Sequence, residues 1–124
     1  MNNDGILVSV KKMLGIEPDV NVFDDTLLAH INTVISVLGQ LGVGPEGGLY
    51  VGDKSTWADL IGEDNRLLMA KTYVQTKVRM LFDPPSSSAA MDAADRFLKE
   101  MEWRILAVTD YNAGNKGGIT EDDK

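Results

Sequence analysis

The chain has 124 residues, no cysteine and a formal net charge of −7. This length suits one compact domain around one hydrophobic core. The absence of cysteine excludes disulfides and thiolate metal sites, and the negative charge argues against a protein that holds nucleic acid by counterion release. No apolar run reaches the roughly 20 residues that span a bilayer, and residues 1–4 lack a basic signal-peptide segment. We therefore expect a soluble intracellular product.

The first predicted helix is short. Asp4 can cap its N-terminus, and the spacing of Ile6, Leu7 and Val10 places them on one inward face. Gly15 suits the end of this helix, because glycine readily adopts the left-handed conformation that often ends helices.

The second predicted helix begins near Asp24, which we interpret as its N-cap. Phe23 before it and Leu28 after it have the spacing of a hydrophobic staple. Further apolar residues recur in steps of three and four, which predicts one buried face, formed by Leu27, Ile31, Val34 or Ile35, and Leu38. The helix is expected to end within residues 39–42.

A glycine-rich loop follows over residues 42–54, with five glycines and one proline in thirteen residues. Residues 49–51 within it could form a short extended segment. Thr56 and Asp59 then have the spacing of a capping box, with Asp in place of Glu, and predict a single-turn helix that contains Trp57 and Leu60.

Residues 65–108 predict two long helices that fold back on each other as an antiparallel hairpin. Pro84 and Pro85 interrupt them, since proline lacks an amide hydrogen and disfavours a helical residue before it. Ser86, Ser87 and Ser88 offer caps for the second helix. The expected inward residues are Leu67, Ala70, Val74, Val78 and Leu81 on the first helix, and Ala90, Ala94, Phe97, Met101, Ile105 and Val108 on the second.

The sequence thus predicts an all-α fold: a small bundle of three main helices with a short N-terminal helix. We expect one domain over residues 1–111 and a flexible tail over residues 112–124, which has little to bury. Charge is unevenly distributed, with a balance of −7 over residues 1–65 and +2 over residues 66–104. Such a pattern fits either ordinary solvated faces or like subunits that meet through unlike surfaces.

The sequence offers no catalytic, cofactor or metal site. The only histidine, His30, lies at the edge of a predicted apolar face and lacks ligand partners at suitable spacing. Residues 42–47 match G-x-G-x-x-G, but a helix precedes them, Pro45 interrupts them and Glu46 would repel a pyrophosphate. The three serines have no nearby base and are best explained as caps. We therefore do not expect an enzyme.

The ordered set of motifs resembles the small head–tail connector (adaptor, or DNA-packaging) proteins of tailed bacteriophages, over roughly residues 5–108. The segments that carry the resemblance are DDTLLAHINT from Asp24, LGQLGVG from Leu38, W-x-D-L from Trp57, KTYV from Lys71, KVRMLFDPP from Lys77 and EWRI from Glu102.

This resemblance implies an all-α structural protein of the virion at the head–tail junction, which is present in the host cytoplasm during assembly. It implies a ring of copies beneath the portal that extends the DNA channel, through which DNA passes without sequence-specific binding. It also implies docking of the next head-completion or tail protein, and no cofactor or membrane. The C-terminal segment is a candidate for portal docking, with Tyr111 and Ile119 as its apolar residues.

Candidate subunit-interface residues follow from the charge pattern. The basic candidates are Arg79, Arg96 and Arg104, and the acidic candidates are Asp59, Glu63 and Asp64. Trp103 lies off the main apolar stripe, so it either packs against the Trp57 segment or forms part of a subunit contact.

Two other functions stay open at this point. One is a small all-α interaction or regulatory module that acts as a monomer or dimer. The other is a helical DNA-binding protein that uses the basic hairpin, although its cations are interleaved with acids. The oligomeric state separates the first of these from a ring-forming connector.

Overall fold

The structure is a computed structural model that describes the backbone of residues 5–122 and the side chains of residues 5–111. Its elements are α1 (Ile6–Leu14), α2 (Asp24–Gln40), α3 (Trp57–Ile61), the 3₁₀ turn η2 (Asn65–Leu67), α4 (Leu68–Phe82) and α5 (Ser88–Asp122). Over the described range there is no strand, only an isolated bridge between Gly5 and Thr56. The all-α prediction is confirmed.

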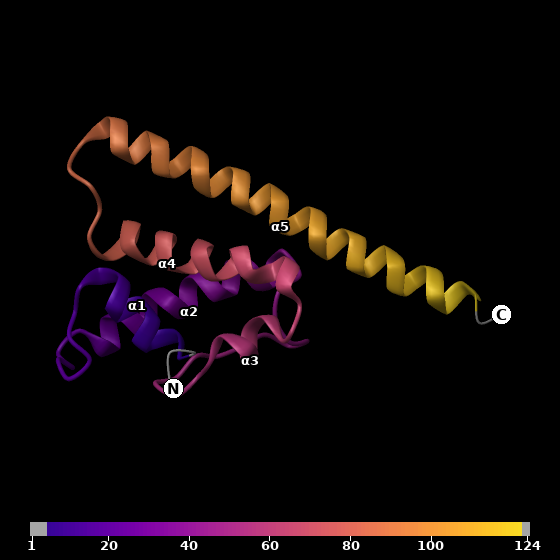
Figure 1. Cartoon of the computed structure of the whole chain (residues 1–124), viewed down its shortest axis with the longest axis horizontal. Helices are drawn as coiled ribbons and strands as arrows, with labels where there is room; N and C mark the ends of the chain where they lie inside the picture. Colours follow the sequence, from indigo (N-terminus) through magenta and orange to yellow (C-terminus); the bar gives the residue numbers. More distant parts are fainter. Residues whose placement is uncertain (1–4, 123–124) are drawn as a thin grey trace.

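Helix α4 lies in the middle of the molecule. It packs on α2 on one side and on α5 on the other, while α1 and α3 contact it at its flanks (Figure 1). Its buried residues Ala70, Val74 and Val78 join the core formed by the predicted inward face of α2. The antiparallel hairpin of α4 and α5 therefore does not stand alone, because α2 covers the side of α4 that faces away from α5.

The N-terminal helix and the short α3 are tied together. The backbone N–H of Ile6 donates to the carbonyl of Ser55 at 2.9 Å, and the indole Nε1 of Trp57 donates to Ser9 Oγ at 2.9 Å. The expected capping box at Thr56 and Asp59 is present, with both reciprocal hydrogen bonds formed. A local sequence motif thus positions Trp57, which is 2% exposed, in the core.

The predicted starts of α1 and α2 need correction. Asp4 lies outside the described residues, and Gly5 stands at the cap position of α1 without a side-chain cap. The N-cap of α2 is Phe23, and Asp24 is the first helical residue. Phe23 thus stands one position later than a staple requires, and the predicted contact with Leu28 stays a prediction. The ring of Phe23 packs edge-on against Phe82 with centroids 5.5 Å apart, a tertiary contact that the local spacing does not indicate.

The Gly-rich loop is irregular, as predicted, and one side chain of α2 anchors it. Asn32 Oδ1 accepts from the backbone N–H of Val51 at 2.7 Å, and Asn32 Nδ2 donates to the Val51 carbonyl at 3.0 Å. Asn32 Nδ2 also donates to the carbonyl of Leu28 at 2.9 Å. Because one amide side chain pairs with both backbone groups of Val51, the loop is held against α2 and Val51 is fully buried.

The inward faces of the hairpin differ in part from the prediction. Leu81, Ala90 and Phe97 are exposed, whereas Leu98 and Tyr73 are buried. Leu81 and Ala90 lie beside the proline turn, where α4 and α5 diverge and leave side chains uncovered (Figure 1). Tyr73 is buried because α4 has packed neighbours on two sides, so its buried surface is wider than one stripe.

Tyr73 links α4 to α5, since its hydroxyl donates to Glu102 Oε2 at 2.7 Å. Burial and this hydrogen bond raise the pKa of the Tyr73 hydroxyl above its ordinary value of 10.0. The unfolded chain therefore releases this proton at lower pH than the folded chain does. The contribution to stability is complete below about pH 10 and is lost as the pH rises further.

We expect Tyr73→Phe to lower the free energy of unfolding by about 2 kcal/mol near neutral pH, because it removes a hydrogen bond to a carboxylate. The difference from the wild type should shrink at about pH 11, where the hydroxyl of the unfolded wild type ionises. Urea unfolding of both proteins at the two pH values measures this. A difference that stays constant with pH would contradict the assignment.

Helix α5 is fixed to α2 near the end of the compact body. Thr109 Oγ1 donates to the carbonyl of Leu41 at 2.7 Å. A Cβ at Gly42, whose φ is +96°, would lie 3.1 Å from Thr109 Cβ, so glycine allows this close approach. The backbone of α5 continues beyond this contact to Asp122 and projects from the body (Figure 1). Helix α5 is thus longer than the sequence predicts. The flexibility of residues 112–124 stays a prediction.

Candidate assembly surfaces

The outer side of α5 carries exposed apolar residues. Trp103 is 70% exposed, and Leu106, one turn further along, is 40% exposed. The expected packing of Trp103 on the Trp57 segment is wrong, because Trp57 is buried and has Ser9 and the ammonium of Lys71 as its neighbours. The alternative, in which Trp103 forms part of a subunit contact, stays a prediction.

The basic candidates differ in whether they form an ion pair within their own chain. Arg104 pairs with Glu100 of the same helix, with Nη2 2.6 Å from Oε2. Arg79 on α4 and Arg96 on α5 are exposed and have no ion pair within the described side chains, 5–111. The latter two cations are therefore available to an external partner.

The acidic candidates lie on α3 and just after it, in a different region from the arginines (Figure 1). Asp59 accepts from the backbone N–H of Thr56 in the capping box. Asp64 pairs with Arg66 at 3.2 Å, and Glu63 is exposed. Two of the three carboxylates thus already have a structural role, and the structure does not bring acidic and basic candidates together within one copy.

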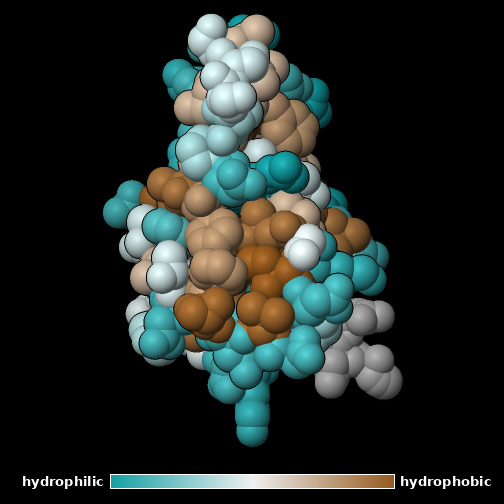
Figure 2. All heavy atoms as spheres, turned by 90° about the vertical axis from the view of Figure 1, so that its left-hand side faces the viewer, coloured by the Kyte–Doolittle hydropathy of each residue, from teal (hydrophilic) through white to brown (hydrophobic). Residues whose placement is uncertain are grey.

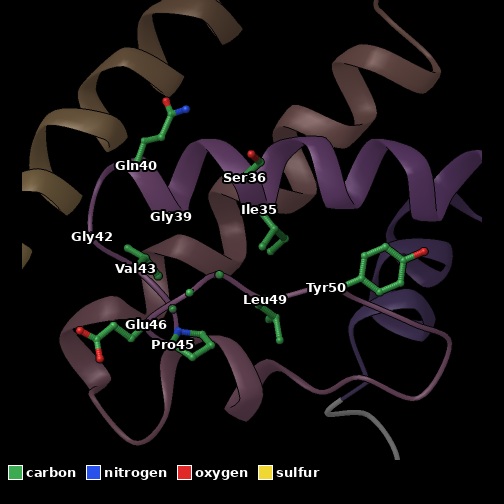
Figure 3. Close-up of a pocket in the computed structure, with 13 residues that line it drawn as sticks. Ile35, Ser36, Gly39, Gln40, Gly42, Val43, Pro45, Glu46, Leu49 and Tyr50 are labelled. Carbon is green, nitrogen blue, oxygen red and sulfur yellow. The ribbon is translucent and has the colours of Figure 1, made fainter.

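The Gly-rich loop and the C-terminal half of α2 enclose an open depression of about 950 Å³, here called the loop hollow (Figure 3). Its lining consists of Ile35, Ser36, Gly39, Gln40, Gly42 and residues 43–50. Glu46 is its one charged side chain, and Glu46 and Tyr50 stand at opposite ends of it in this view. The sequence did not predict this hollow, and its only signal was the clustering of glycines.

The loop hollow contains the G-x-G-x-x-G match, and its geometry is unsuited to a nucleotide. Helix α2 ends at Gln40 and so presents its C-terminus, where carbonyl groups carry partial negative charge. A phosphate is bound at a helix N-terminus instead. Glu46 is exposed at the same place and adds a full negative charge. The negative charge at this site therefore disfavours an anionic ligand.

A second apolar surface, here called the apolar end, lies opposite the projecting end of α5. Figure 2 shows hydrophobic side chains gathered there, where the connection between α1 and α2 lies beside the end of α4. We define it by Phe23 and Phe82, whose rings pack on each other, and by their exposed sequence neighbours Val22 and Leu81. Val22 is 78% exposed. Contiguous apolar surface of this kind is typical of contact sites.

The C-terminal candidates lie on α5. Tyr111 is 58% exposed, and its ring lies 5.4 Å from Arg66 Cζ in a cation–π contact. The side chain of Ile119 lies outside the described residues. Tyr111 is therefore attached to the body of its own chain, and the part of α5 that projects freely begins after it.

The structure offers little that would suit chemistry. His30 is half-buried at the edge of α2, as its position in the sequence indicates. Among the described residues, no group of His, Asp and Glu is arranged to hold a metal ion. No helix within the described range has an apolar stretch long enough to cross a bilayer.

These features define a small all-helical protein whose distinctive surfaces are suited to contacts with other proteins. The family model for phage connector proteins matches residues 6–112, so the chain belongs to the phage connector protein family. It is a structural component of a bacteriophage particle, a head–tail connector. Comparison with curated proteins and with solved structures finds no match.

Proposed function

We propose that this connector assembles as a ring beneath the portal, extends the DNA channel and docks the next head-completion or tail protein. The observation that carries the proposal is the family match over residues 6–112, together with a fold whose exposed surfaces differ from side to side. A closed ring needs such unlike surfaces, because each copy meets its two neighbours through different faces.

The arrangement of charge supports a head-to-tail contact. Arg79 and Arg96, which have no ion pair among the described side chains, lie on the hairpin, and the carboxylates of Asp59, Glu63 and Asp64 lie on and after α3. Between neighbouring copies, these groups can attract each other without any pairing inside one copy. The net charge of −7 suits a channel through which DNA slides without sticking.

The two ends of the molecule suit two different partners. The projecting end of α5 is suited to enter the portal, with Tyr111 and Ile119 as candidate contacts, while the apolar end lies on the opposite side of the body (Figure 1). We assign the apolar end to the protein that joins next on the tail side. The connector would assemble in the host cytoplasm and remain in the virion at the junction of head and tail.

The solution mass of the protein, measured by light scattering alone and then with the portal of the same phage, tests this function. We expect a large closed species in at least one of the two samples. A monomer or dimer in both would contradict the ring and favour an interaction module that shares only the fold.

A chain shortened after Tyr111 separates portal docking from folding. The contacts of Thr109 and Tyr111 with the body remain in this variant, so its helical content and unfolding midpoint should match those of the full chain. We expect its affinity for the portal to fall about tenfold or more, since the projecting segment is missing. Unchanged portal binding would contradict the role of the C-terminal segment.

A further inference from the structure

The apolar end combines a fixed base with exposed side chains. The rings of Phe23 and Phe82 pack on each other, so the start of α2 and the end of α4 are joined there. Phe23 nonetheless stays 41% exposed and Leu81 stays 45% exposed, and Val22 is the most exposed of the set (Figure 2). Side chains that packing already holds in place lose little freedom on binding, so this surface is prepared for a contact.

A buried ammonium shapes the connection between α1 and α2 beside the apolar end. Lys11 Nζ donates to the carbonyl of Pro18 at 3.1 Å and also lies 2.9 Å from Asp24 Oδ1. Because one nitrogen atom contacts both residues, the chain folds back on itself between them. The residues next to Pro18 therefore lie close to the residues next to Asp24.

Three carboxylates occupy these neighbouring positions. Glu17, Asp19 and Asp25 are exposed and have no ion pair within the described side chains. Lys11 balances the charge of Asp24 alone, and the connection contains no lysine or arginine of its own. The apolar end thus has an acidic edge along the connection.

The other side of the apolar end is closer to neutral. Asp83 follows Phe82 directly, and it lines a depression of about 390 Å³ together with Arg79. The opposite charges of these two side chains offset each other in part. The negative potential at the apolar end therefore comes mainly from the connection.

We propose that the apolar end binds an apolar side chain of the tail-side protein that lysine or arginine residues flank. Those cations would lie beside the acidic edge formed by Glu17, Asp19 and Asp25. The inference rests on the proposed function and specifies the chemistry of that partner. In such a contact the apolar centre holds the complex together, whereas unlike charges at the edge speed up association.

The acidic edge disfavours other occupants of this surface. A second copy that met it with its own apolar end would bring two sets of the same carboxylates together, and like charges across a contact lower affinity. Nucleic acid and anionic lipid surfaces are negatively charged as well. A partner with cations around an apolar residue matches both the apolar centre and the acidic edge.

Binding kinetics on immobilised head-completion and tail proteins of the same phage, taken in turn, test the inference. For the wild type we expect one of them to bind, with an association rate that falls as salt rises, because salt screens the attraction. Glu17→Gln/Asp19→Asn should lower the association rate about threefold or more at low salt and flatten its salt dependence. Val22→Ser should instead raise the dissociation rate about tenfold, since it removes exposed apolar surface from the centre.

Glu46→Gln/Asp53→Asn is the matched control, because it changes the net charge equally. Both residues are exposed in the Gly-rich loop, which follows the opposite end of α2, and neither has an ion pair within the described side chains. This variant should bind with the rates of the wild type. An equal loss in the control would mean that net charge alone acts and would overturn the role of the acidic edge.

The remaining outcomes separate this inference from the function on which it rests. If none of the phage proteins binds the wild type, the proposed tail-side docking is wrong and the inference falls with it. If one binds and Val22→Ser keeps the wild-type rates, docking stands but uses another surface. If Val22→Ser weakens binding and salt has no effect, the partner's cations are wrong. If the variants change the solution mass of the connector alone, the occupant is a second copy. Helical content and unfolding midpoint should match the wild type throughout, since every replaced side chain is exposed.

Discussion

Replacement of Asn32 by alanine is expected to lower the free energy of unfolding by about 3 kcal/mol. The side-chain amide satisfies both the N–H and the carbonyl of Val51, at 2.7 and 3.0 Å, and the Val51 side chain is fully buried. Alanine would leave two backbone groups without partners, each of which costs roughly 1–3 kcal/mol when buried. Urea unfolding at neutral pH, followed by circular dichroism, measures the difference.

Two neighbouring changes show whether the hydrogen bonds to Val51 are responsible. Thr33→Ala removes an exposed hydroxyl that bonds only within α2, and it should change stability by less than about 0.5 kcal/mol. Asn32→Asp keeps the acceptor for the Val51 N–H but loses the donor to the Val51 carbonyl, so its effect should be substantial. An Asn32→Ala variant as stable as Thr33→Ala would refute the anchoring role.

Local signals in the sequence predicted the helices well. The capping box of Thr56 and Asp59, the glycine at the end of α1 and the proline turn each depend on a few adjacent residues. The buried face of α2 follows from periodicity, because a helix that packs on one side repeats its apolar residues every three or four positions. Such features can be predicted because their cause lies within one element.

Features that depend on how elements meet were predicted less well. Leu81 continues an apolar stripe, yet it is exposed, because the two helices diverge towards the proline turn. Phe97 is exposed because α5 packs through the neighbouring stripe of Leu98, Met101 and Ile105. Phe23 satisfies the spacing of a local staple but packs on Phe82, nearly 60 residues away. The loop hollow arises from the path of a loop that a single distant side chain, Asn32, fixes, and no local pattern encodes that path.

Asp24 is another residue whose role depends on a contact between two elements. In the sequence it has the position of a helix cap, but its carboxylate lies 2.9 Å from the ammonium of Lys11, whose side chain is only 5% exposed. Lys11 Nζ also donates to the carbonyl of Pro18 at 3.1 Å. The ion pair thus closes the connection between α1 and α2, the segment that carries Val22 and Phe23 of the apolar end.

Asp24→Ala is expected to lower the free energy of unfolding by about 3 kcal/mol, because it leaves the buried ammonium of Lys11 without its counter-charge. This value is at the low end of the range for broken buried pairs, since the Asp24 side chain is 24% exposed. Asp25→Ala is the matched control. Asp25 is exposed in the same first turn of α2, so its loss should cost about 0.5 kcal/mol through the helix dipole.

The double variant Lys11→Met/Asp24→Ala distinguishes an unpaired charge from lost packing. Methionine retains a long apolar side chain at the buried position and removes the charge, so the double variant should be more stable than Asp24→Ala by about 2 kcal/mol. If Asp24→Ala is no less stable than Asp25→Ala, the ion pair does not hold the α1–α2 connection. If it is less stable and the double variant recovers, the apolar end depends on a buried charge pair. The docking that we propose for the tail-side protein should then weaken in Asp24→Ala and return in the double variant.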